Sequence, residues 1–510
     1  MRKQKEKTVA KFGARDKFGY MMGDFGCNMS FQLITTYLMI FMTDALHIQP
    51  FHFTILIIIA KVFDAINDPI IGALVDRRKP GKNGKYKPWI FWGAFAILAS
   101  TTLLFMPVDS FPYWAKWAYV LVMYMIWSVS YTAANVPYGS LNAALTDKQN
   151  ERASLSALRN IGAGLAMVPV LVLVPILTEN NPNMYVVVAL ACGLIGVFGF
   201  LCTIFLCKER RQTVAANADA PKANYFRTLR DFFKNRAVLA LSIASIAQIV
   251  FIQSYAALFP YVFKYYFQET KIMGVANVLA MAGMMVFIPF MGKLSGKYGK
   301  KEICTWPNIL GMIGLVVMII MSVTGAFPRN LTGAIIYTAL YMITMVGAGT
   351  FFLATWGMVA DCVDEQEVET GRRDEASIYA TYSLSRTIAQ GLGGGLVGLC
   401  IGMVGFNADN SFEANSALGV SGSILNISLI LPLIGFIIIF VTLFFMYNLN
   451  KKKVEYNTDF LRSKNAQALI DCETATKCFY EISEGDDDAI SHDIVTEEET
   501  TKEELESNKE

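Results

Sequence analysis

Two aspartates and an asparagine lie within one apolar stretch of this sequence. The segment reads Asp64-Ala-Ile-Asn67-Asp68, and helical spacing places the three polar side chains on one face. A carboxylate at the centre of a membrane-spanning helix costs about 2.5–3.5 kcal/mol, so the pair needs compensation. A bound cation or protonation of one carboxylate would supply it. The alternative is that the pair lies near the cytoplasmic end of its helix and forms ion pairs with Lys61 or Arg77.

A second polar group ends another apolar stretch, in the segment Tyr131-Thr-Ala-Ala-Asn-Val-Pro-Tyr-Gly-Ser140. Pro137 and Gly139 interrupt helix regularity and can expose backbone carbonyls to a cavity. Thr132 and Asn135 offer side-chain oxygens at the same place. The alternative for each residue is an ordinary hydrogen bond between helices.

Arg159 lies about one turn inside a further apolar stretch and needs a partner at that depth. Its guanidinium suits a sugar hydroxyl or carboxylate, bound bidentately, and the alternative is that it neutralises Asp64 or Asp68. On the first apolar stretch, Asp24 and Asn28 lie one turn apart. Asn28 is the deeper of the two, so we predict a structural role for Asp24.

The composition indicates that membrane-spanning helices position these side chains. Of 510 residues, 54% are hydrophobic and 17% are charged, against about 25% charged in soluble proteins. Apolar runs near the 20 residues that span a bilayer recur along the chain, so we predict an all-α membrane protein. The predicted spans are 19–43, 53–75, 88–107, 117–143, 154–177, 184–206, 237–262, 272–294, 303–325, 332–360, 376–404 and 424–447.

Loop charge predicts the orientation of these twelve spans. Lys and Arg gather in alternate loops, whereas 44–52, 178–183 and 405–423 contain neither. Positive loops stay in the cytoplasm, so both termini are predicted to be cytoplasmic and the chain to be a multi-pass protein of the cell membrane. Topology explains the basic loops, so we expect no nucleic-acid partner. We also expect no cofactor.

An internal repeat predicts how the spans are grouped. Gly72-Ala-Leu-Val-Asp follows the second span and Gly292-Lys-Leu-Ser-Gly follows the eighth, while Glu151-Arg-Ala-Ser precedes the fifth and Glu375-Ala-Ser-Ile precedes the eleventh. Both pairs are offset by about 220 residues, which indicates two parallel six-helix bundles, the major facilitator arrangement. We predict an N-terminal bundle at 1–207, a cytoplasmic middle loop at 208–236, a C-terminal bundle at 237–448, and an acidic, disordered tail at 449–510.

Six segments spread over residues 15–450 carry a family resemblance. They are Gly23-Asp-Phe-Gly26, Asp64-Ala-Ile-Asn-Asp-Pro-Ile-Ile-Gly72, Gly84-Lys-Tyr-Lys-Pro-Trp89, Asn135-Val-Pro-Tyr-Gly-Ser-Leu141, Glu151-Arg through Arg159, and Asp361-Cys-Val-Asp through Gly371-Arg-Arg-Asp-Glu375. The chain resembles the glycoside–pentoside–hexuronide:cation symporters, which are similar to melibiose permease and have the major facilitator fold. The resemblance implies a cation site at Asp64, Asn67, Asp68 and Thr132, and it favours sodium among the possible ions.

The resemblance also implies a sugar site that departs from the melibiose permease pattern. Two family aspartates fall on Asn28 and Asn135, and a family arginine is kept as Arg159. A family tryptophan falls on Phe352. A family lysine falls on Thr387, with Arg386 beside it. Loss of two acids with retention of Arg159 leads to the hypothesis that an anionic sugar, such as a hexuronide, is admitted.

These observations predict a transporter that moves a sugar together with a monovalent cation, with a lipid bilayer around it. We expect sodium-coupled symport by alternating access, with the two bundles moving about a central site. The alternatives of the same fold are a proton-coupled symporter and a sugar exchanger. A channel, a receptor and a membrane enzyme are less favoured, since the three histidines, His47, His52 and His492, have no catalytic neighbours.

Overall fold

The computed structural model describes residues 12–78, 81, 84–146, 149–179, 181, 183–210, 235–371, 375–461 and 463–464. Over these residues the protein consists of helices and connecting loops, as the sequence predicted. Most of the predicted middle loop (211–234) and the predicted tail from residue 465 lie outside the described residues.

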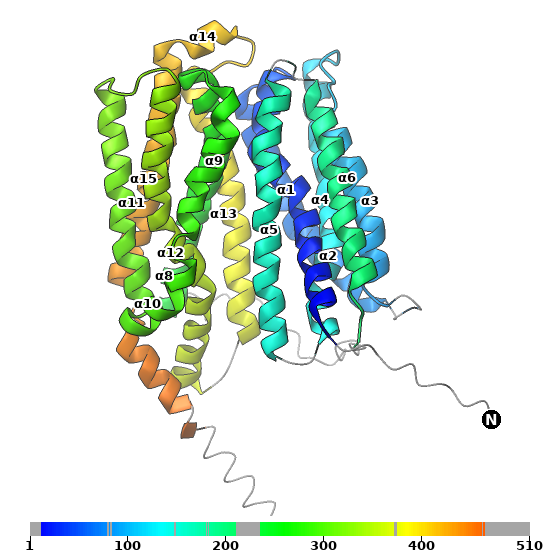
Figure 1. Ribbon diagram of the computed structural model, residues 1–510, viewed down its shortest axis with the longest axis vertical. Coiled ribbons are helices and arrows are strands. Elements are labelled where there is room, and N and C mark those ends of the chain that lie inside the picture. Colours follow the sequence, from blue (N-terminus) through cyan, green and yellow to red (C-terminus); the bar gives the residue numbers. More distant parts are fainter. Residues whose placement is uncertain are drawn as a thin grey trace, which may run out of the picture. The chain divides into compact units, whose positions relative to one another are not determined.

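The helices of the first half coincide with the predicted apolar segments and run alongside one another (Figure 1). Pro50 begins the second helix, where the N–H that proline lacks would have no partner within the helix. The helices are α1 (Ala14–Asp44), α2 (Pro50–Arg77), α3 (Lys87–Leu104), α4 (Tyr113–Leu145), α5 (Gln149–Thr178) and α6 (Met184–Leu206).

The second half is less regular. Asn235 caps its first helix, because the side-chain oxygen accepts hydrogen bonds from the N–H groups of Ala237 and Val238 at 3.1 Å. One predicted span, 272–294, is divided among three shorter helices. The elements are α8 (Arg236–Tyr261), π-helix η1 (Val262–Phe267), α9 (Thr270–Met285), 3-10 helix η2 (Ile288–Phe290), α10 (Met291–Tyr298), α11 (Lys300–Val323), α12 (Leu331–Thr370), α13 (Glu375–Met403), α14 (Phe412–Ser416), α15 (Leu418–Val441) and π-helix η3 (Thr442–Met446).

The surface of the long helices suits a lipid environment. Large apolar side chains such as Trp92, Phe205 and Met403 are exposed to 71%, 70% and 81%, while many threonine, serine and asparagine side chains are buried. Backbone and polar groups satisfied inside helices are what a bilayer requires. Within the described residues, eight helical segments are long and apolar enough to cross a membrane: α1, α4, α5, α6, α8 with η1, α11, α12, and α15 with η3.

The chain divides into two compact units. The first comprises 1–359 and 376–448 and contains every predicted site residue; the second comprises 360–375 and 449–510. In the second unit, residues 451–461 form a helix, so the first part of the predicted tail is ordered into secondary structure. Asn457 of this helix donates a 2.5 Å hydrogen bond to the buried carboxylate of Glu365, which also pairs with Lys453.

Glycines allow α1 and α6 to cross closely. A Cβ added to Gly26 would lie 2.5 Å from the backbone oxygen of Gly196, and one added to Gly196 would lie 2.9 Å from the oxygen of Gly26. No side chain fits where two backbones approach to this distance, so both positions require glycine. This contact fixes α1, which carries Asp24 and Asn28, against the rest of the first half.

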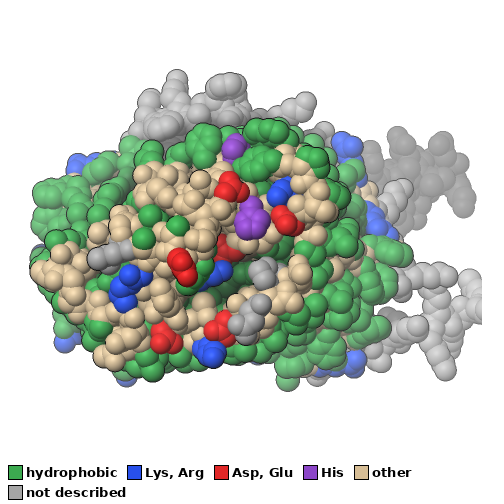
Figure 2. Space-filling view, turned by 90° about the horizontal axis from the view of Figure 1, so that it is seen from above, with side chains coloured by type: hydrophobic (Ala, Val, Ile, Leu, Met, Phe, Trp, Pro, Cys, Tyr) green, Lys and Arg blue, Asp and Glu red, His purple; other side chains and the backbone are tan. Residues whose placement is uncertain are grey.

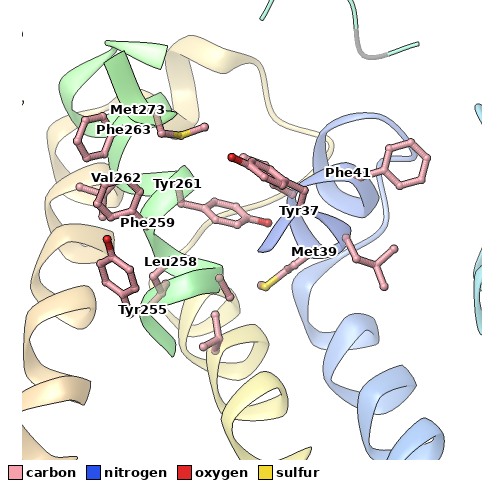
Figure 3. Packing of buried hydrophobic residues seen from close by; sticks show 14 of the residues in the cluster. Tyr37, Met39, Phe41, Tyr255, Leu258, Phe259, Tyr261, Val262, Phe263 and Met273 are labelled. Atoms are coloured by element: carbon pink, nitrogen blue, oxygen red, sulfur yellow. The ribbon is translucent and has the colours of Figure 1, made fainter. Parts of the chain in front are cut away.

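The two halves meet where α1 contacts α8 and η1. Tyr261 lies opposite Tyr37 and Met39 of α1 within a cluster of buried aromatic and aliphatic side chains (Figure 3). The Tyr261 hydroxyl lies 2.7 Å from Thr43 Oγ1. Asp44 forms an ion pair with Lys264 and accepts a 2.8 Å hydrogen bond from Tyr265. We call these five polar residues, Thr43, Asp44, Tyr261, Lys264 and Tyr265, the α1–η1 cluster.

Further polar contacts join the halves at the same end of the molecule. The Gln49 side chain donates hydrogen bonds to Asn407 at 2.6 Å and to Asp409 at 2.9 Å, and His47 Nδ1 lies 3.0 Å from the carbonyl of Ala408. Viewed from the α14 end, acidic, basic and histidine side chains gather on this face (Figure 2). The halves are therefore joined here by an apolar cluster with a polar layer at its edge.

Candidate functional site

Helices α2 and α4 place two carboxylates opposite two hydroxyls. Asp64 and Asp68 are one turn apart on α2, and Ser128 and Thr132 are one turn apart on α4. The Ser128 hydroxyl donates a short hydrogen bond to Asp64 Oδ1, and Thr132 Oγ1 donates to Asp68 Oδ1 over 2.7 Å. The equal spacing on both helices brings the two pairs into register. Asp64, Asp68 and Thr132, three of the four predicted cation residues, therefore belong to one cluster.

Asn67, the fourth predicted cation residue, is buried beside Asp68 on α2. Its amide nitrogen has no hydrogen-bond partner among the described atoms. A buried amide without a partner loses the free energy of its hydrogen bonds to water. The nitrogen and oxygen of an asparagine amide exchange places by a half-turn of the side chain, so Asn67 can present either a donor or an oxygen ligand at this position.

Lys61 forms an ion pair with Asp64, which the sequence offered as an alternative to a cation site. Lys61 Nζ lies 2.9 Å from Asp64 Oδ2, and the two side chains are exposed to 20% and 11%. The sequence-based alternative placed the pair near a helix end. Instead, Asp64 lies near the middle of α2, which runs from Pro50 to Arg77. The ion pair therefore belongs to this cluster and is not a contact at a helix end.

A second polar cluster joins α1, α4 and α5 around Arg159. Arg159 Nε donates to Asp24 Oδ1 over 2.9 Å, and Nη2 donates to Asn135 Oδ1 over 3.3 Å. Asn28 Nδ2 donates to Asp24 Oδ2 over 3.0 Å. The guanidinium also lies 5.4 Å from the ring centroid of Tyr138, within cation–π range. The predicted sugar residues Asn28, Asn135 and Arg159 therefore lie together.

The partner of Arg159 differs from the predicted ones. Neither Asp64 nor Asp68 neutralises it; the ion pair is with Asp24, whose side chain is 6% exposed against 37% for Arg159. The buried carboxylate thus holds the guanidinium at Nε and Asn135 holds it at Nη2, while part of the arginine side chain remains exposed. Asp24, to which we had given a structural role, orients the arginine that the sequence analysis had assigned to the sugar.

The predicted sugar residues of the second half, Phe352, Arg386 and Thr387, lie on α12 and α13. Arg386 of α13 lies 5.6 Å from the ring centroid of Trp356 and 5.9 Å from that of Tyr382, whose hydroxyl accepts a 3.4 Å hydrogen bond from Nη1. Thr387 follows Arg386 on α13, and Phe352 lies on α12 with 46% of its surface exposed. The described contacts thus place Arg386 on aromatic rings of its own half.

Sequence reasoning missed two contributors to these clusters. Ser128 was not identified, although its spacing of four from Thr132 matches the spacing of Asp64 and Asp68 and was the available signal. Lys61 was named only as a possible ion-pair partner, and its spacing of three from Asp64 gave no sign of which rotamer it adopts. Both residues contact Asp64, so they change how that carboxylate can bind an ion.

A family model described as MFS/sugar transport protein matches residues 19–451 of this chain. The chain belongs to the MFS/sugar transport protein family. This confirms the resemblance that the sequence segments indicated, and it makes the protein a transporter rather than an enzyme. A transporter of this family is a multi-pass protein of the cell membrane that carries a small sugar-like molecule across the lipid bilayer.

Curated relatives match this transporter over most of their length. It is 29% identical to the uncharacterized symporter YjmB of Bacillus subtilis (strain 168), over 88% of this chain and 95% of that protein. It is 25% identical to the glucuronide carrier protein homolog of Escherichia coli (strain K12), over 85% and 92%. The crystal structure of a D-xylose–proton symporter superimposes with a TM-score of 0.60 at 12% identity, over 83% of this chain and 97% of that one, which shows the major facilitator fold.

Proposed function

We propose that this transporter couples uptake of a sugar to entry of sodium, by alternating access. The observation that supports it most is the pairing of Asp64 and Asp68 on α2 with Ser128 and Thr132 on α4. The cluster gathers carboxylate and hydroxyl oxygens, and hard cations take oxygen ligands. Asn67 supplies an amide that can turn its oxygen toward the same ion.

The expected topology has twelve spans with both termini in the cytoplasm. On this topology the α1–η1 cluster lies at the extracellular end, where α1 finishes at Asp44. The ion pair of Asp44 with Lys264 and the packing of Tyr261 against α1 support a conformation in which this end is closed. Alternating access then requires that these contacts separate when the carrier opens outward.

The sugar is expected to bind between the halves, with Arg159, Asn28 and Asn135 on the first half. Asn28 and Asn135 already bond to the Asp24–Arg159 pair, so they orient it and can also present polar groups to sugar hydroxyls. Phe352, Arg386 and Thr387 are the proposed contributors from the second half. Glycosides, pentosides and hexuronides are the candidate substrates, and the exposed part of Arg159 favours an anionic one.

The test is sugar accumulation in membrane vesicles, with the sodium gradient and the pH gradient imposed separately. We expect an inward sodium gradient to drive accumulation of one sugar in a panel of labelled glycosides, pentosides and hexuronides. Accumulation that follows only the pH gradient would reassign the coupling ion to the proton. Accumulation that follows neither gradient would contradict coupled symport.

Two variants connect the activity to the site. Asp64→Asn and Asp68→Asn should each abolish accumulation while counterflow exchange of sugar continues, because exchange needs no net ion transfer. The matched control is Asp109→Asn, which removes a carboxylate that pairs with Lys116 at 3.2 Å but is 59% exposed. If both site variants accumulated sugar like the unaltered carrier, the proposed cation site would be wrong.

A further inference from the structure

Lys61 is a basic residue in direct contact with the proposed cation site. Its ammonium lies 2.9 Å from Asp64 Oδ2, and the hydroxyl of Ser128 bonds to Asp64 Oδ1. Both oxygens of this carboxylate are therefore engaged. A coupling cation that binds Asp64 must displace Lys61 from the carboxylate or share it.

The net charge of Lys61, Asp64 and Asp68 on α2 matches the binding of one monovalent cation. Asp64 and Asp68 contribute two negative charges and Lys61 contributes one positive charge. Asp68 accepts a hydrogen bond from Thr132, but within the described part of the chain it has no ion-pair partner. The three side chains together therefore carry a charge of −1, and one sodium ion or one proton would neutralise the group.

The stem of Lys61 lies between the two halves of the carrier. A Cβ added to Gly391 of α13 would lie 3.0 Å from Cγ and 3.1 Å from Cβ of Lys61. Nearby, Thr54 of α2 donates a 2.8 Å hydrogen bond to the carbonyl of Gly395. Helix α2 thus packs directly on glycines of α13, and the space available to the lysine depends on how the halves approach each other.

We propose that Lys61 is a tethered counter-ion that competes with the coupling cation for Asp64. This inference rests on the proposed cation site. In the empty carrier the ammonium neutralises Asp64, so that return across the membrane does not carry two uncompensated carboxylates through a low-dielectric interior. When the cation binds, the ammonium withdraws on its flexible four-carbon stem. Separation of α2 from α13 gives the stem the space to do so.

The experiment is calorimetric titration of the purified full-length carrier with sodium chloride at constant ionic strength. Lys61→Met and Lys61→Gln each remove the competing charge, so one folded variant is sufficient. We expect the sodium dissociation constant to fall by about tenfold or more, the scale of one charge interaction in a partly buried site. Lys61→Arg keeps the charge and should stay within about threefold of the unaltered carrier. Lys116→Met is the matched control, since it removes a buried lysine that contacts Asp109 and Leu46 away from this site.

A second measurement uses the space that opens when the Lys61 side chain is shortened to alanine. In Lys61→Ala, added methylammonium should weaken sodium binding, because it can enter beside Asp64, whereas it should have no effect on the unaltered carrier. In vesicles, Lys61→Met should keep counterflow exchange but lose net accumulation, since the empty carrier returns poorly. A purely structural lysine would not produce tighter sodium binding.

Asp64→Asn separates the two proposals. If it loses sodium binding while the charge-removing Lys61 variants bind sodium more tightly, both proposals hold. If it loses sodium binding while those variants bind sodium as before or more weakly, the competition model is wrong and the cation site stands. If Asp64→Asn binds sodium like the unaltered carrier, the cation site is wrong, and the role of Lys61 fails with it.

Discussion

Replacing Asp24 by asparagine tests whether its pairing with Arg159 sets the charge preference of the sugar site. The ion pair joins Nε to Oδ1 at 2.9 Å, and Asp24 is nearly buried while Arg159 is 37% exposed. In Asp24→Asn the amide oxygen can still accept from Arg159. The new amide nitrogen, however, faces the donor nitrogen of Asn28 that bonded to Oδ2, so the Asn28 amide must turn.

The magnitude lies between two limits. Breaking a fully buried pair costs about 3–5 kcal/mol, and an exposed pair contributes about 0–1 kcal/mol. Because Arg159 keeps part of its contact with solvent, we expect a loss of about 2 kcal/mol in the free energy of unfolding. An anionic sugar that pairs with the freed guanidinium can recover part of this free energy as binding free energy. A recovery of about 1.4 kcal/mol corresponds to a tenfold change in affinity.

The assay compares methyl glucuronide with methyl glucoside as inhibitors of labelled sugar uptake, since the two differ only by a carboxylate in place of a hydroxymethyl group. The ratio of their inhibition constants should shift about tenfold toward the glucuronide in Asp24→Asn. The control is Asp16→Asn on the same helix, which breaks the 2.8 Å pair of Asp16 with Arg210 outside the proposed sugar site. An unchanged ratio, or an equal change in the control, would refute the reasoning.

Two further predictions concern contacts outside the proposed site, at the ends of helices. Lys264→Met removes the ion pair with Asp44. Amide hydrogen exchange at 41–48 and 262–268 should then accelerate by about tenfold, which corresponds to roughly 1.4 kcal/mol in the free energy of local opening. Unchanged exchange would mean that the pair does not hold this end closed. The Glu209 carboxylate accepts hydrogen bonds of 2.7–3.3 Å from the three backbone N–H groups of 85–87, where α3 begins. Glu209→Gln removes its negative charge and one acceptor oxygen, so the free energy of unfolding measured by thermal unfolding should fall by about 1–2 kcal/mol. The matched control is Glu179→Gln, which should show a smaller effect, because within the described residues the Glu179 carboxylate accepts one hydrogen bond, from the Thr270 hydroxyl.

Sequence reasoning worked best where a physical rule acts locally. The need for about 20 apolar residues to cross a bilayer indicated the long helices, and the all-helical, major facilitator-like fold was predicted correctly. Sequence-based prediction of helix boundaries was less accurate where helices are interrupted. The predicted span at 272–294 is divided near Pro289, among α9, η2 and α10, and α12 continues to Thr370, ten residues beyond its predicted end at 360.

The candidate site was predicted in part, for a related reason. Spacing on α2 placed Asp64 and Asp68 on one face, but spacing says nothing about which helix lies opposite, so Ser128 was missed. Similarly, Asp24 and Arg159 are separated by 135 residues and pair across α1 and α5. Partners of this kind depend on the packing of whole helices, which the close crossing at Gly26 and Gly196 fixes only in three dimensions.

The pairing of charges within the first unit gives the two carboxylates of α2 different roles. Among the described residues of this unit, five aspartates have a basic partner: Asp16 with Arg210, Asp24 with Arg159, Asp44 with Lys264, Asp64 with Lys61 and Asp109 with Lys116. Asp68 has only the Thr132 hydroxyl within the described chain, so it is the charge that a coupling cation must compensate. Asp68→Asn would then remove the attraction for the cation. Asp64→Asn would instead release Lys61 to neutralise Asp68. Each change leaves the remaining aspartate and Lys61 without net charge, so both abolish coupling, and removal of the lysine from either variant should restore one negative charge and with it the attraction for a cation.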